Sequence, residues 1–527
     1  MRNYLMVSSY FRIALYVVFF LFISVSMTAQ ITERQRPQEW SKIMKGCRFV
    51  DRFLPMTGHE KNAVWGTDSV KMRFTDNGIE SDSISFWGGN IIKDDKGVYH
   101  LFVCGWLECS PNGHMFWPNS TVYHAVSDSL SGPFKIRNSI GKGHNPEAFM
   151  LDDGRVIVYV IDGYYIADSL DSRVWTYGNF DFDTRGHKIK EGLSNLTFTR
   201  RPDGSFLMID RGGGVWISKD GISTYHLLGD NSVYPPVEGE FEDPVVWRDS
   251  VQYNLIVNDW FGRIAYYMRS PDGVEWDTEI GEAYMPGIAR HSDGESEAWF
   301  KYERPKVYLD TLGRVVQMNF AVIDTIKWND IPGDHHSSKN ICIPVRRDLK
   351  ISLEKVTSRH IYISVFPEEG FDPCSDLDAV TVRLGAANDV NIGKGISPVR
   401  SFKKEGRLIL TFAKKSLVSP STLKFIGTDR SGNVHSAYVN YPESRMQRSI
   451  LSPGKTTYDK NTGLIKVEVT NFGLSESCKC RAVIRAGMTR LGILDVDPLR
   501  PYESVVLKLK ATDLSDDAQM SVEIVEP

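Results

Sequence analysis

The stretch Glu242-Asp243-Pro244-Val245-Val246-Trp247 has four counterparts elsewhere in the chain. Each begins with polar or acidic residues and continues into an apolar strand, which a turn and a second apolar strand follow. The counterparts begin at Trp87-Gly88-Gly89-Asn90, His144-Asn145-Pro146-Glu147, Ser194-Asn195-Leu196-Thr197 and Glu303-Arg304-Pro305-Lys306. Alignment on Gly89, Pro146, Leu196, Pro244 and Pro305 gives spacings of 57, 50, 48 and 61 residues by subtraction. A repeat of about fifty residues with several short strands predicts a β-propeller, and five starts predict five blades.

The rest of the chain also has the pattern of an all-β protein. Runs rich in Val, Ile, Tyr, Phe and Trp are separated by Asp-Gly turns such as Asp153-Gly154, Asp203-Gly204 and Asp272-Gly273. Helical periodicity is almost absent. A strand around Val70 to Phe74 is expected to close the ring against the last blade.

The repeat ends near residue 350, and two further β-rich segments follow. Alternating strands at 381–384 and 408–412 predict a β-sandwich over 351–445, and those at 464–471 and 504–510 predict a second over 446–527. The predicted division is therefore an N-terminal segment with ring closure (30–79), a five-bladed propeller (80–350) and two small β-sandwich domains. The length of 527 residues suits about three domains.

The N-terminus predicts export. Arg2 and Arg12 flank an apolar stretch at 13–25, which small residues follow up to Ala29. We expect a signal peptide over 1–29 that is cleaved after Ala29. The apolar stretch is short for a spanning helix, which needs about 20 residues, although an uncleaved anchor is the alternative. The mature chain is thus expected in the periplasm or outside the cell, without stable membrane insertion.

Composition excludes several classes of protein. Hydrophobic residues make up 42% of the chain and aromatic residues 11%, which is too much for a disordered chain. The 62 basic residues face 66 acidic ones, so a nucleic-acid partner is not expected. Seven cysteines in 527 residues do not form a dense disulfide framework.

The blade starts are where functional side chains are expected to meet. The innermost strands of a propeller line its central channel, so residues at their starts gather at one mouth. Four carboxylates are expected there, from Glu147, Glu242, Asp243 and Glu303. Crowded like charges raise at least one carboxyl pKa, which suits a general acid. The other candidates at this mouth are His144, Asn195, Arg211, Arg304, Trp87 and Trp117.

These starts, the blade count and the turns resemble the five-bladed glycosidase superfamily, and glycoside hydrolase family 43 in particular, over about residues 80–345. The resemblance implies a role for Glu147 as the acid that tunes a neighbouring pKa. The general acid of the family lies in a Glu-Gly-Pro or Glu-Cys-Pro motif, and both Glu242-Asp243-Pro244 and Glu303-Arg304-Pro305 are similar to it. The family's base lies in an Asp-Pro-Ser motif of the first blade. This chain has Gly88-Gly89-Asn90 there, and the nearest carboxylate is Asp82.

The resemblance implies an exported glycoside hydrolase that acts on a polysaccharide or oligosaccharide. Hydrolysis needs a proton donor and a second carboxylate. We expect Glu242 or Glu303 as the acid, and Asp243 or Glu147 as the base or tuner. The residues expected to bind sugar hydroxyls or an acidic or sulfated sugar are His144, Asn195, Arg211 and Arg304. Trp87 and Trp117 are expected to stack on sugar faces.

Two alternatives remain open at this stage. One is a propeller lyase acting on uronate-containing glycans, with His144, Arg211, Arg304 and Tyr164 as its candidates. The other is a non-catalytic glycan-binding surface protein. No metal or other cofactor is expected, except that calcium in the channel is compatible with the family. The last segment resembles immunoglobulin-like adhesion modules.

Overall fold

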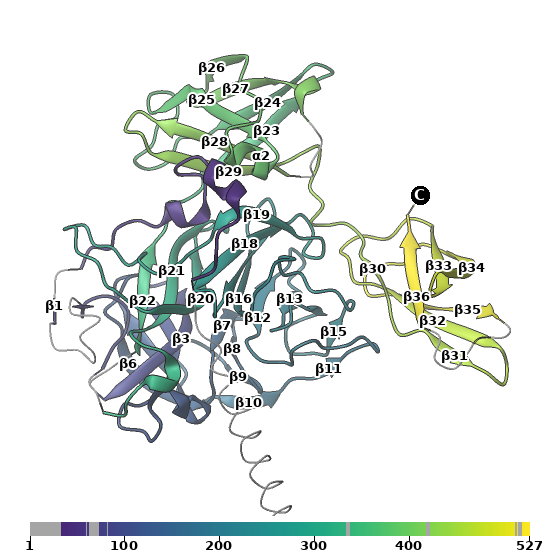
Figure 1. Cartoon of the computed structure of the whole chain (residues 1–527), viewed down its shortest axis with the longest axis horizontal. Helices are drawn as coiled ribbons and strands as arrows, with labels where there is room; N and C mark the ends of the chain where they lie inside the picture. Colours follow the sequence, from purple (N-terminus) through teal and green to yellow (C-terminus); the bar gives the residue numbers. More distant parts are fainter. Residues whose placement is uncertain are drawn as a thin grey trace, which may run out of the picture.

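The computed structural model describes residues 33–58, 61–62, 73–81, 83–333, 338–417, 422–511, 514 and 519–526 (Figure 1). The predicted signal peptide and Asp82 lie outside these residues. Regular structure is nearly all β-strand, as predicted. The described helices are short, namely η1 (Gln38–Lys42), η2 (Phe49–Arg52), η3 (Gly113–Asn119), η4 (Lys327–Asn329), α2 (Ala387–Asn391) and η5 (Lys414–Ser416). None of the described helices has the length and apolarity to cross a membrane.

Five sheets follow one another between residues 84 and 344, and their strands pair mainly with their neighbours in sequence. The first sheet contains β3 (Ile84–Lys93), β4 (Tyr99–Leu107), β5 (Thr121–Ser127) and β6 (Lys135–Lys142). The second contains β7 (Glu147–Met150), β8 (Val156–Val160), β9 (Gly163–Ala167) and β10 (Thr176–Asn179). The third contains β12 (Thr197–Arg200), β13 (Phe206–Ile209), β14 (Val215–Ser218) and β15 (Tyr225–Leu227), with β11 (Phe182–Asp183) parallel to β15. The fourth contains β16 (Phe241–Arg248), β17 (Tyr253–Asp259), β18 (Ile264–Ser270) and β19 (Asp277–Glu282). The fifth contains β20 (Lys301–Leu309), β21 (Val315–Ile323) and β22 (Ser338–Pro344).

The first strands of these sheets lie around a common centre. Strand β3 contacts both β7 and β20, and β16 contacts both β12 and β20. The fifth sheet therefore returns to the first one, and the apolar side chains of neighbouring sheets form the core between them.

Residues 73–79 lie against the fifth sheet, whereas residues 70–72 of the predicted closing strand lie outside the described residues. Of the strand expected around Val70 to Phe74, the structure describes only β2 (Arg73–Phe74), which pairs with β1 (Lys61–Asn62). Two contacts join this segment to the fifth sheet: Lys339 Nζ of β22 donates to the Phe74 carbonyl at 2.8 Å, and Ile79 forms a β-bridge with Asn340 of the same strand. The Asn77 side chain strengthens these contacts, because it donates to the Cys342 carbonyl at 2.8 Å and accepts from the Cys342 N–H at 2.9 Å.

A shared backbone feature marks all five starts. The residue before each aligned position has a positive φ: 60° at Gly88, 57° at Asn145, 54° at Asn195, 58° at Asp243 and 49° at Arg304. In β3, β16 and β20 the strand register also shifts at this point, as in a β-bulge. Bulges of this kind redirect a side chain away from the strand's regular alternation. Here they turn these positions toward a small cavity at the ring centre, which all five residues line.

Two further pairs of sheets make up the C-terminal part. The first pair consists of β23 (Ile351–Val356), β24 (His360–Val365), β26 (Arg400–Lys404) and β27 (Arg407–Ala413), facing β25 (Leu377–Gly385), β28 (Thr422–Asp429) and β29 (Val434–Asn440). The second consists of β30 (Leu451–Pro453), β31 (Thr457–Asp459), β32 (Leu464–Asn471) and β35 (Ser504–Lys510), facing β33 (Cys480–Ala486), β34 (Thr489–Val496) and β36 (Met520–Val525). Each pair shares one apolar cluster. All seven cysteines are unpaired.

Both pairs contact the ring of five sheets, the first above it and the second at its side in Figure 1. A buried ion-pair network joins the first pair to the fourth sheet. Glu279 of β19 contacts Lys424 of β28, and it also lies 2.8 Å from Arg269 Nε and accepts a hydrogen bond from the Tyr438 hydroxyl at 2.9 Å. The second pair contacts the third sheet through Arg185, whose Nη1 donates to the Ser452 hydroxyl at 2.6 Å.

Candidate functional site

Four of the predicted residues form one network at the ring centre. The Arg304 guanidinium lies between two of the other starts, with Nε 2.9 Å from Asp243 Oδ1 and Nη2 donating to Asn195 Oδ1 at 2.6 Å. Asn195 Nδ2 in turn donates to Glu242 Oε1 at 2.7 Å and to Asp243 Oδ1 at 3.3 Å. The convergence predicted from the repeat therefore holds for Asn195, Glu242, Asp243 and Arg304.

Glu242 is the carboxylate of this network that solvent reaches. Its side chain is 13% exposed, whereas that of Asp243 is fully buried. Burial alone would raise the pKa of Glu242, but the positive charges of Lys327 and Arg304 outweigh burial and hold this pKa below its usual value. Glu242 is thus ionised in the free protein. This differs from the raised pKa expected of a general acid.

Asp243 has the opposite titration behaviour although it is adjacent in sequence. Burial raises its pKa to about 6, against the attraction of Arg304 and with a further contribution from the negative charge of Glu242. The Arg304 N–H also donates to Asp243 Oδ2 at 3.1 Å. The two carboxyls share the Asn195 amide, so they titrate as a pair. Near pH 6 this pair offers one ionised carboxylate and one group that holds a proton.

Glu303 is enclosed by two lysines that sequence reasoning missed. Lys301 Nζ lies 3.4 Å from Glu303 Oε1, and Lys327 Nζ contacts Oε2. Burial favours the neutral acid, but these two ammonium groups lower the pKa of Glu303. The Glu303 carboxylate is fully buried. Glu303 is therefore better described as a structural charge that positions Lys327 than as the predicted general acid.

Glu147 lies in a separate buried ion pair. Its carboxylate contacts Lys306 Nζ and accepts from the Thr197 hydroxyl at 3.4 Å. Burial raises the pKa of Glu147, and Lys306 opposes this effect. Its carboxylate contacts neither Glu242 nor Asp243, so any tuning by Glu147 acts through the intervening Lys306 charge.

The aromatic residues at the mouth differ from those predicted. Trp87 is 1% exposed and packs against Trp106 and His114, so it offers no face to a sugar. The structure instead places Trp260 beside Lys301 and Lys327, the two lysines that contact Glu303, and the Trp328 ring lies edge-to-face against Trp260 with centroids 6.0 Å apart. Lys327 Nζ lies 5.8 Å from the Trp260 centroid, and 46% of Trp328 is exposed.

Trp117 remains a candidate for substrate contact. It is half-buried in η3, and its ring lies 4.8 Å from that of His144. His144 is buried, with Nδ1 2.9 Å from the Ser120 hydroxyl. Burial lowers the pKa of His144 well below its usual value, and Arg304 adds to this effect, so the ring is neutral. A buried neutral imidazole is a hydrogen-bonding group rather than a cationic one.

Arg211 lies at the rim rather than in the centre. It is half-exposed and its Nε lies 3.5 Å from Glu191 Oε2. Its charge nevertheless contributes to the low pKa of Glu242. Among the described residues, no group of three His, Cys, Asp or Glu side chains is arranged to hold a metal ion.

No protein-family model and no curated protein matches the chain. Similar solved structures include an α-L-arabinofuranosidase from Lactobacillus brevis, with 12% identity and a TM-score of 0.35 over 51% of this chain and 92% of that one. A thermostable family-43 glycoside hydrolase has 13% identity and a TM-score of 0.31 over 55% and 92%. Fructan 1-exohydrolase IIa from Cichorium intybus has 11% identity and a TM-score of 0.36 over 85% and 93%. The predicted resemblance to family 43 is thus found again among these structures. Because all three TM-scores are low, the function proposed below rests on the side chains of this chain.

Proposed function

We propose that the chain is an exported glycoside hydrolase in which Glu242 is the reactive carboxylate. The observation that supports this most strongly is the position of Glu242, which is ionised, open to solvent and hydrogen-bonded to Asn195, next to an Asp243 whose pKa is about 6. The five sheets would be the blades of a propeller over 80–350, with two β-sandwich domains after it.

Glycosidic bond cleavage requires an ionised carboxylate and a source of a proton. In this proposal Glu242 attacks the anomeric carbon, or takes a proton from the attacking water, as the glycosidic C–O bond breaks. The proton that the leaving oxygen takes up comes from Asp243 through a water molecule, because the Asp243 side chain is buried. Lys327 and Arg304 are positioning residues that keep Glu242 ionised. Gly88 leaves the first start without a carboxylate, and Glu242 takes over that role from the fourth sheet.

A non-catalytic glycan-binding protein is the second candidate. The lack of a carboxylate at Gly88 and the burial of Asp243 and Glu303 favour this candidate. Glu242 is then the one carboxylate of these starts that can touch a ligand. The aromatic pair Trp260–Trp328 would serve such a protein equally well.

The two candidates and the lyase differ in their products. The purified chain is incubated with a panel of plant and algal oligosaccharides, and the products are separated by chromatography. Hydrolysis releases saturated saccharides with new reducing ends. Unsaturated products would indicate a lyase, and binding without products would indicate the glycan-binding protein. Either of these last two outcomes contradicts the proposal.

The acid limb of the pH profile tests the ionised state of Glu242. Because its pKa is lowered below the usual 4.5, kcat/KM is expected to fall on the acid side only below pH 4.5, whereas loss of the Asp243 proton sets an alkaline limb near pH 6. Lys327→Met removes the main positive charge and is expected to shift the acid limb upward by about one pH unit. Lys96→Met, which removes an exposed ammonium paired with Asp171, is the matched control. An unmoved acid limb in Lys327→Met would refute this assignment.

Trp328→Ala is expected to weaken substrate binding. The exposed indole offers a face for a sugar ring, and stacking on such a face contributes about 1 kcal/mol. KM should therefore rise roughly fivefold to tenfold while kcat changes less than twofold. Trp175→Ala, away from the mouth, serves as control. Equal KM values for Trp328→Ala and the wild type would exclude a contact with substrate.

A further inference from the structure

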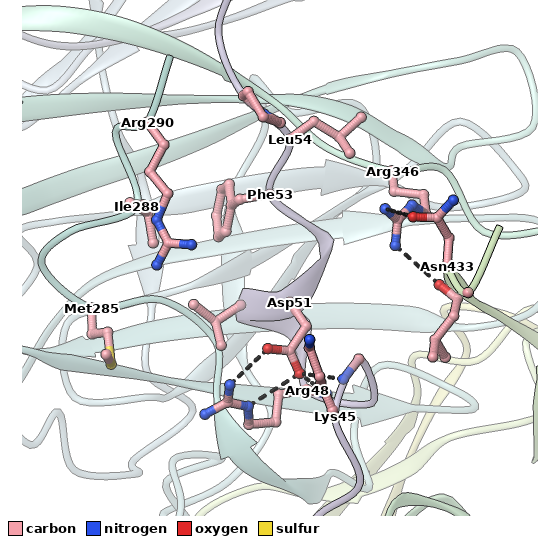
Figure 2. A pocket seen from close by; sticks show the side chains of 15 residues that line it. Lys45, Arg48, Asp51, Phe53, Leu54, Met285, Ile288, Arg290, Arg346 and Asn433 are labelled. Atoms are coloured by element: carbon pink, nitrogen blue, oxygen red, sulfur yellow. Dashed lines mark hydrogen bonds and ion pairs between the residues drawn. The ribbon is translucent and has the colours of Figure 1, made fainter. Parts of the chain in front are cut away.

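A second cavity lies where three parts of the chain meet. Its volume is about 470 Å³, and it lies between the N-terminal segment, the loop after β19 and the turn between β28 and β29 (Figure 2). This volume is within the range of small-ligand sites, about 300–1,000 Å³. Its lining residues are distinct from those of the network around Glu242.

The cavity wall carries an excess of positive charge. Lys45, Arg48, Arg290 and Arg346 line it, whereas the one carboxylate in the lining is Asp51. That carboxylate is already occupied, because it accepts from Arg48 Nη2 at 2.7 Å and from the Arg48 and Gly46 backbone N–H groups at 3.1 Å each.

Three of these cations have no carboxylate partner among the ion pairs of the described residues. Arg290 Nε donates to the Gly287 carbonyl at 3.1 Å. Arg346 donates to the Val434 carbonyl at 3.1 Å and to Asn433 Oδ1 at 3.3 Å, which are both neutral acceptors. Lys45 is exposed at the rim. Figure 2 shows Arg290 and Arg346 on opposite sides of the cavity.

The surface between these cations is apolar. Phe53 and Leu54 lie between Arg290 and Arg346 in Figure 2, and Met285 and Ile288 extend this surface on one side. A ligand that fits must therefore combine an anionic group with a broad, weakly polar face. A sugar ring that carries a carboxylate or a sulfate has both properties, since its C–H face packs on apolar side chains while guanidinium groups bind the anion.

We infer that this cavity is a second saccharide site that binds an acidic unit of the glycan, remote from the bond that is cleaved. The anionic group would lie between Arg290, Arg346 and Lys45. The choice of a saccharide rests on the proposed function, whereas the preference for an anion rests on the cavity alone. Because Arg346 holds the Asn433–Val434 turn, the site is assembled by the docking of the β23–β29 unit on the ring.

Isothermal titration calorimetry on the full chain carrying Glu242→Gln tests this inference without turnover. The probes are trigalacturonate, its fully methyl-esterified form and a sulfated galactose trisaccharide. At least one acidic probe should bind, and the sulfated and carboxylated probes distinguish the two anions. The neutral ester should bind at least about tenfold more weakly than trigalacturonate if the carboxylate is recognised.

Variants locate the binding. Arg290→Gln and Lys45→Gln, both at exposed side chains, should each weaken binding of the acidic probe about tenfold, because each removes a charge-assisted contact. Arg173→Gln, an exposed arginine outside the cavity, should leave the affinity unchanged. Unchanged affinity in both cavity variants, or an equal loss in Arg173→Gln, would overturn the inference. If the product assay detects no hydrolysis but binding still depends on Arg290, the proposed function fails while this site stands.

Discussion

Glu242→Gln is expected to lower kcat/KM for oligosaccharide hydrolysis at least about 1,000-fold. The amide keeps the size of the side chain, but it carries no charge and cannot accept a proton or attack an anomeric carbon. KM should change little, since Asn195, Trp260 and Trp328 remain in place. The measurement is the initial rate of reducing-sugar release at several substrate concentrations.

Glu240→Gln is the matched control for this variant. Glu240 lies two residues away and is exposed, and its printed contacts are through the backbone. The control should retain wild-type rates. Hydrolysis by Glu242→Gln at more than a tenth of the wild-type rate would show that another group carries the reaction.

Lys424→Met is expected to destabilise the protein by about 3–5 kcal/mol, the usual cost of removing one partner from a buried ion pair. The substitution leaves the Glu279 carboxylate buried at the junction of β19 and β28, with Arg269 as its remaining cation. Urea unfolding followed by tryptophan fluorescence measures the effect, because the ring sheets contain most of the buried tryptophans.

The double variant Lys424→Met/Arg269→Met should be less stable than Lys424→Met alone, because the Glu279 carboxylate is then buried with neither of its two cations. Equal stabilities of the single and double variants would contradict the ion-pair account.

The stability of the wild type is also expected to depend on pH. The folded-state pKa of Glu279 is about 2 against a usual 4.5, so its contribution is complete above pH 4.5 and is lost as pH falls toward 2.

The architecture can be predicted from the sequence because each repeat carries a local sequence signal at its start. Pro146, Pro244 and Pro305 mark positions that directly follow a residue of positive φ. Asn and Asp tolerate that conformation better than most residues, and they occupy three of the five positions. Arg304 is the exception, and its ion pair with Asp243 accounts for its presence.

The site was predictable only in part because its electrostatics come from other segments. Lys327 and Trp328 belong to η4, between β21 and β22, and no repeat signal points to that loop. The Lys327 charge lowers the pKa of Glu242, and the Trp328 ring packs against Trp260. The place of Trp87 at a blade start predicts sugar stacking, but its buried side chain packs against Cys104 and Trp106 of β4 and against residues of β21.

The most direct test is a crystal structure of Glu242→Gln with an oligosaccharide that the wild type cleaves. The account predicts that the anomeric carbon of the scissile bond lies within about 3.5 Å of the side chain at position 242, the distance of a reactive geometry, with a sugar ring against Trp328. An oligosaccharide whose scissile bond lies at another carboxylate, with position 242 free of contact, would contradict it.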